Sequence, residues 1–88
     1  MNTQQINNTV FALIDMSSTV GYTNSTQVST PFGSISLELL DAFESACLMK
    51  FLNRLYLEGG ANTKASALTE MCIVEQHIAT LRSLPTVH

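Results

Sequence analysis

The sequence has 88 residues, of which 45% are hydrophobic and 12% are charged, with a formal net charge of −3. Soluble domains usually carry about 25% charged residues, so the polar surface of this chain must consist largely of its many Ser, Thr, Asn and Gln side chains. The length suffices for one small core, which predicts a single domain over residues 1–88. Four Lys and Arg residues against seven Asp and Glu residues argue against direct nucleic-acid binding.

Residues 1–17 form the first segment, which we predict to be a helix. Asn2 followed by Gln5 resembles a capping box. Apolar residues then recur at helical spacing, at Ile6, Val10, Leu13 and Ile14. These signals predict a helix from about Thr3 to Met16.

A strand interpretation of the same region stays open. Residues 9–14 and 19–22 also have the composition of strands, and residues 23–25 are typical of a turn. This alternative is an α+β fold with a short N-terminal β-hairpin. Residues 18–35 are predicted to be an uncharged, Ser/Thr-rich connection, because no Asp, Glu, Lys, Arg or His occurs between Asp15 and Glu38.

Residues 36–84 have the pattern of a helical hairpin. Apolar residues fill about half of a helical wheel from Leu37 to Leu57, with Ser34 or Ser36 as the expected N-cap. A second helix is predicted from Asn62 or Thr63 to Leu84, before Pro85. The short Gly59-Gly60-Ala61 join makes the two helices antiparallel neighbours. The predicted fold is therefore mainly α, with a C-terminal antiparallel helical hairpin packed on an N-terminal helix.

Glu44 is the charged residue that this pattern places near the centre of an apolar helix face. An unpaired buried carboxylate is costly, so we expect Glu44 to be satisfied or exposed. Antiparallel pairing brings it to the level of Glu75 and His77. Three alternatives remain for Glu44: a hydrogen-bonded pair with His77 or Arg54, a contact with another chain, or a metal or acid–base site with Glu75 and His77. The metal or acid–base site is the weakest alternative, because Glu75 and His77 occupy different helix faces.

The two cysteines, Cys47 and Cys72, fall at the same level of the predicted hairpin. Helix axes about 8–10 Å apart only sometimes permit a disulfide, so both are expected to be buried, reduced thiols. Two cysteines do not form the dense framework of a small secreted domain, and no signal or membrane-spanning segment is visible in the sequence. We therefore expect a cytoplasmic protein that is not bound to a membrane.

Several residues are candidates for binding another protein. Met49 and Tyr56 lie two turns apart on the otherwise polar side of the first long helix, and interfaces are enriched in Met and aromatic residues. Tyr22 and Phe32 are the aromatic residues of the uncharged connection. Together with Glu44, these four form the predicted partner-binding set.

No motif for catalysis, phosphate binding or metal binding is found, so we expect no enzymatic activity and no cofactor. The favoured function is a non-enzymatic protein-binding module that docks on a partner protein, for example a phage- or plasmid-type inhibitor of host machinery such as an anti-CRISPR. A small secretion-type chaperone or adaptor and a structural homodimer are the alternatives. A homodimer is expected in any case, because the broad apolar helix faces exceed what one hairpin buries.

Overall fold

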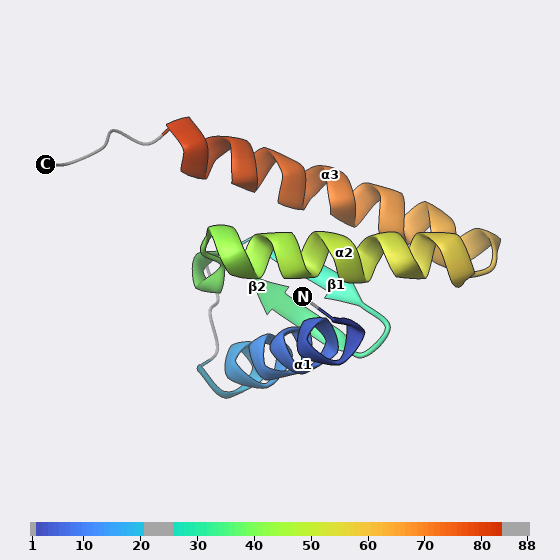
Figure 1. Ribbon diagram of the computed structural model, residues 1–88, viewed down its shortest axis with the longest axis horizontal. Helices are drawn as coiled ribbons and strands as arrows, with labels where there is room; N and C mark the ends of the chain where they lie inside the picture. The colour runs from blue at the N-terminus through green and yellow to red at the C-terminus, as the bar shows by residue number, and fades with distance from the viewer. Residues whose placement is uncertain (1, 21–25, 84–88) are drawn as a thin grey trace, which may run out of the picture.

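The computed structural model describes residues 2–20 and 26–83. Its elements, in chain order, are α1 (Thr3–Val20), β1 (Gln27–Thr30), β2 (Gly33–Ser36), the 3-10 helix η1 (Leu37–Leu39), α2 (Ala42–Glu58) and α3 (Ala61–Ser83). Helix α2 lies between α1 and α3, and the small sheet lies alongside, with β2 against α1 and β1 against α3 (Figure 1). The predicted mainly α fold, with a helical hairpin after an N-terminal helix, is confirmed.

Helix α1 begins where the sequence predicted. The Asn2 backbone N–H donates to Gln5 Oε1 (3.0 Å), and the Gln5 N–H donates to Asn2 Oδ1 (2.8 Å), which is the expected capping box. The helix extends beyond Met16 to Val20, so the strand alternative for residues 9–14 is wrong. Tyr22 and the proposed turn at residues 23–25 lie outside the described residues.

A β-hairpin occupies residues 27–36, where the sequence predicted a connection and the first turn of a helix. Strands β1 and β2 are antiparallel, with Val28 opposite Ile35 and a two-residue turn at Pro31 and Phe32. Val28 and Ile35 are fully buried. The hairpin was missed because each strand has only four residues and contributes few alternating apolar positions.

Both edges of the hairpin are bonded to helix side chains. The Ser36 N–H donates to Ser17 Oγ on α1 (2.9 Å), and the Ser29 N–H donates to Glu70 Oε2 on α3 (3.0 Å). Backbone groups on an edge strand would otherwise depend on water or on another chain. The hairpin is therefore fastened to the first and the last helix of the fold.

Helix α2 begins later in the chain than the wheel predicted. Its N-cap is Asp41, not Ser34 or Ser36, and Leu37 belongs to the short 3-10 helix. The carbonyl oxygen of Leu40, immediately before the cap, lies 2.9 Å from His77 Nε2 on α3. The apolar pattern continues through this bend because the leucines of the 3-10 helix pack against the same core.

The core lies where α2 meets the other elements. Its buried cluster comprises Val10, Leu13, Val28, Ile35, Leu40, Leu48, Phe51, Leu52 and Val74. In α3 the burial is narrower than predicted, because Ala67 and Val74 are buried while Leu68 and Cys72 are exposed. Among the described residues, no helix is both long and apolar enough to span a membrane.

Two buried serines provide a matched test of the hairpin attachment. Ser17→Ala leaves the buried Ser36 N–H without its partner, so we expect a loss of about 1–3 kcal/mol in the free energy of unfolding, measured by urea denaturation. Ser45 is fully buried and its Oγ has no hydrogen-bond partner within the described structure, so Ser45→Ala should be neutral or stabilising. Equal losses in the two variants would contradict this account.

Candidate functional site

The tip of the β-hairpin presents an aromatic side chain to the solvent. Phe32, in the turn, is 57% exposed, and its ring meets the ring of Phe11 on α1 edge to face, with 5.3 Å between centroids. Both rings also contact Phe51 of α2, at 6.0 and 6.1 Å. Phe51 is buried and Phe11 is 43% exposed, so the aromatic cluster Phe11, Phe32 and Phe51 has a buried base and two exposed members.

Local hydrogen bonds fix the tip. Thr30 Oγ1 donates to the carbonyl oxygen of Gly33 (2.8 Å) and accepts from the N–H of Phe32 (3.1 Å). Gly33 has a φ of 148°, and an added Cβ there would lie 2.6 Å from Ile14 Cγ2, so only glycine allows the hairpin this close to α1. Phe32 is thus presented from a defined backbone and is braced by two further rings.

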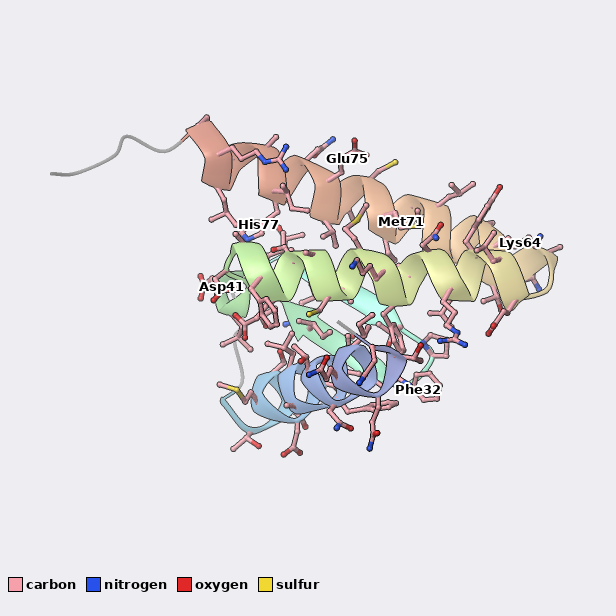
Figure 2. All side chains as sticks on the ribbon, viewed as in Figure 1. Phe32, Asp41, Lys64, Met71, Glu75 and His77 are labelled. Carbon is pink, nitrogen blue, oxygen red and sulfur yellow. The ribbon has the colours of Figure 1, made fainter. Side chains whose placement is uncertain are left out.

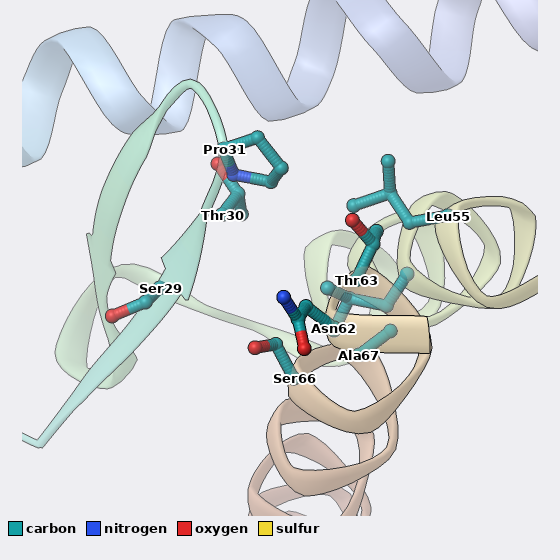
Figure 3. A pocket seen from close by; sticks show the side chains of 9 residues that line it. Ser29, Thr30, Pro31, Leu55, Asn62, Thr63, Ser66 and Ala67 are labelled. Carbon is teal, nitrogen blue, oxygen red and sulfur yellow. The ribbon is translucent and has the colours of Figure 1, made fainter. Parts of the chain in front are cut away.

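A groove adjoins the tip on its α3 side (Figure 3). It has a volume of about 290 Å³ and lies between the hairpin, α2 and the first two turns of α3. Its lining is apolar at Leu52, Leu55 and Ala67 and otherwise mainly hydroxyl or amide, and none of its lining residues is ionisable: Ser29, Thr30, Pro31, Leu52, Leu55, Asn62, Thr63, Ser66 and Ala67. Such a lining suits an uncharged side chain.

Among the predicted partner-binding residues that the structure describes, Phe32 is the one whose side chain is exposed. Met49 is half-buried and packs against the core. Tyr56 is half-buried too, with Lys64 Nζ of α3 lying 5.4 Å from its ring centroid. Met49 and Tyr56 therefore do not form an open stripe on the polar side of α2. Tyr22 lies outside the described residues.

The expectation that Glu44 is satisfied or exposed is confirmed: Glu44 lies at the N-terminal end of the apolar face of α2, where it is partly exposed and hydrogen-bonded. Glu44 is the third residue of α2, where its N–H donates to Asp41 Oδ1 (2.8 Å) and its Oε1 accepts from the Asp41 N–H (3.2 Å). This is a reciprocal capping box, and the carboxylate also lies at the positive end of the helix. The Asp41-x-x-Glu44 spacing is the sequence signal for this cap.

The three residues of the metal or acid–base alternative are not brought together. Glu44 is occupied by its cap, Glu75 is exposed on α3, and His77 contacts the backbone of Leu40. Across residues 2–20 and 26–83, no group of three His, Cys, Asp or Glu side chains is arranged to hold a metal ion.

The two cysteines are reduced thiols in different environments. Cys47 is buried, as predicted, whereas Cys72 is exposed, which corrects the expectation that both are buried. Burial raises the pKa of the Cys47 thiol above its usual value, so this side chain is protonated at neutral pH.

Phe11 was not identified from the sequence as a site residue. It lies outside the stripe of Ile6, Val10 and Leu13 that faces the core, and this displacement is the available sequence signal. A single surface apolar residue is common, so its meaning depends on the contact with Phe32.

Comparisons with known proteins add no functional assignment. No protein-family model, no curated protein and no solved structure matches this chain.

Replacing Glu44 distinguishes a helix cap from a buried charge. Glu44→Gln keeps an acceptor for the Asp41 N–H, so the free energy of unfolding should change by no more than about 0.5 kcal/mol, while Glu44→Ala should cost about 0.5–1 kcal/mol. Thermal or urea unfolding followed by circular dichroism measures both. A Gln variant more stable than wild type by several kcal/mol would instead indicate a buried, unpaired carboxylate.

Proposed function

We propose that this protein is a non-enzymatic protein-binding module that docks on a partner through the hairpin tip and the groove beside it. The observation that carries the proposal is the pair of exposed, mutually contacting rings of Phe11 and Phe32. The hairpin that presents Phe32 contains no ionisable side chain. Depletion of charge and enrichment in aromatic residues are features of the central part of protein interfaces.

The rings also have the rigidity that a binding anchor needs. Phe32 is held by its turn hydrogen bonds and by Phe51, whose ring belongs to the core. A partner therefore does not have to immobilise a flexible side chain on binding, which lowers the entropic cost of association. Aromatic anchors of this kind often dominate interface energetics.

The groove supplies a second point of contact. Leu52, Leu55 and Ala67 offer an apolar surface, and the Ser, Thr and Asn side chains around it offer neutral hydrogen-bonding groups. A partner segment with an apolar side chain flanked by uncharged polar groups fits this lining. A buried charge from the partner would find no opposite charge among the lining residues.

The proposal includes a cytoplasmic setting. Cys72 is exposed and free, which is the state that a reducing compartment maintains. An inhibitor of host machinery is one kind of protein that this docking function would suit.

Two phenylalanines of equal exposure make a controlled test. Phe32 at the tip is 57% exposed and Phe43 on α2 is 56% exposed. Phe32→Ser should reduce the recovery of the native partner at least about tenfold in affinity capture from the native host, quantified by mass spectrometry, because truncating a central aromatic anchor costs about 2 kcal/mol or more.

Phe43→Ser is the control, since it removes the same apolar area outside the proposed site, and it should retain capture. Circular dichroism and unfolding curves establish that both variants are folded. Equal recovery by the two variants and the wild type, or equal loss in both, would show that the hairpin tip is not the docking site.

A further inference from the structure

The outer edge of β2 carries a pair of backbone hydrogen-bonding groups at Ser34 that point away from the hairpin. Ser34 lies directly opposite Ser29, whose N–H points away from β2 because it donates to Glu70 of α3. In an antiparallel pair, two opposed residues either bond each other or both point outward, so the N–H and C=O of Ser34 also point outward. The same alternation is seen two residues further along β2, where the Ser36 N–H donates to Ser17 of α1.

Ser34 differs from Ser29 and Ser36 in having no helix side chain on its outward N–H. Within residues 2–20 and 26–83, no residue is hydrogen-bonded to either backbone group of Ser34, and Ser34 is exposed. A backbone N–H and C=O side by side on the edge of a sheet are a template for the main chain of another segment. The edge of β2 is therefore open at this one residue.

A second groove, the α1-side groove, lies next to Ser34. It has a volume of about 310 Å³ and lies between the second half of α1 and the hairpin. Ile14 and Phe32 contribute apolar surface, Ser18 and Ser34 are among the polar lining residues, and none of the lining residues is ionisable. Phe32 lies on the side of α2 that faces α1 (Figure 2). The groove thus joins the open edge to the exposed ring at the hairpin tip.

We propose that the partner binds here through an extended, uncharged segment, which pairs with Ser34 and places an apolar side chain against Phe32 in the α1-side groove. This inference rests on the proposed docking at the hairpin tip and specifies the chemistry of the partner. An extended residue presents its own N–H and C=O on one side, so it can make both bonds to Ser34 at once. A helix does not offer these groups, because they are bonded within the helix.

The contact formed in this way is short. The Ser36 N–H is already bonded to Ser17, and α1 packs against β2, so the pairing does not continue along β2 beyond Ser34. The two main-chain bonds fix the orientation and register of the segment, while its side chain against Phe32 and Ile14 supplies most of the affinity. An ionised side chain would lose its water without meeting an opposite charge among the lining residues.

A phage-displayed library of fully random heptapeptides, selected on the wild-type protein, provides the probes for a test. The enriched peptides should be poor in charged residues, and their affinities are then measured by calorimetry with two variants of Ser34. Ser34→Pro removes the outward N–H at an edge position where proline is tolerated, and it should weaken binding about tenfold or more. Ser34→Ala is the matched control, because it keeps both backbone groups, and it should bind as the wild type does.

Two further measurements test the same bonds in the unaltered protein. Methylating the backbone nitrogens of an enriched peptide one at a time should weaken binding about tenfold or more at the position that pairs with Ser34. In hydrogen exchange followed by NMR, peptide binding should slow exchange of the Ser34 amide, whereas the Ser29 amide, already bonded to Glu70, should change little.

The proposal is overturned if no peptide is enriched, if the enriched peptides are charged, or if they bind Ser34→Pro as tightly as the wild type. It is also overturned if methylation is tolerated at every position, or if exchange of the Ser34 amide is unchanged. Capture of the native partner separates this inference from the proposed function. Capture that survives Phe32→Ser contradicts docking at the hairpin tip, whereas capture that is lost with Phe32→Ser but kept with Ser34→Pro contradicts the strand pairing alone.

Discussion

Attachment of the two-stranded hairpin to helices at both ends of the chain holds the fold together. An isolated hairpin of this size is marginal in water, because two short strands bury too little apolar surface. Here Ser17 accepts from Ser36 on one edge, and Glu70 accepts from Ser29 on the other. The same contacts satisfy one N–H on each edge and join α1 and α3 to one sheet, while Val28 and Ile35 complete the core beneath α2.

This arrangement places an exposed aromatic surface on a small scaffold. The hairpin tip projects Phe32 on the α1 side of the molecule, supported by Phe51 from the core. The low content of charged residues is related to this surface, because the hairpin and the groove where a contact is proposed contain only uncharged residues.

At the start of α2, the capping residues and the apolar repeat indicate different first residues for the helix. The apolar repeat runs without a break from Leu37, which led the sequence interpretation to place Glu44 inside a buried face. The capping box at Asp41 and Glu44 marks the true beginning of the helix, and it gives the carboxylate a place at the positive end of the helix dipole. The position of Glu44 in the first turn of α2 therefore explains why a charged residue can follow the apolar repeat.

The three helices, the capping box at Asn2 and Gln5, and the helical hairpin could all be predicted from the sequence, because they depend on residues within a few positions of one another. Phe32 was also a candidate at that level, but Phe11, Phe51 and the groove were not. The β-hairpin required the tertiary structure, since its edges are satisfied by side chains distant in the chain. So did the exposure of Leu68 and Cys72, since α2 covers only one side of α3. Periodicity shows that a helix face is apolar, but which part of it is buried depends on the element packed against it.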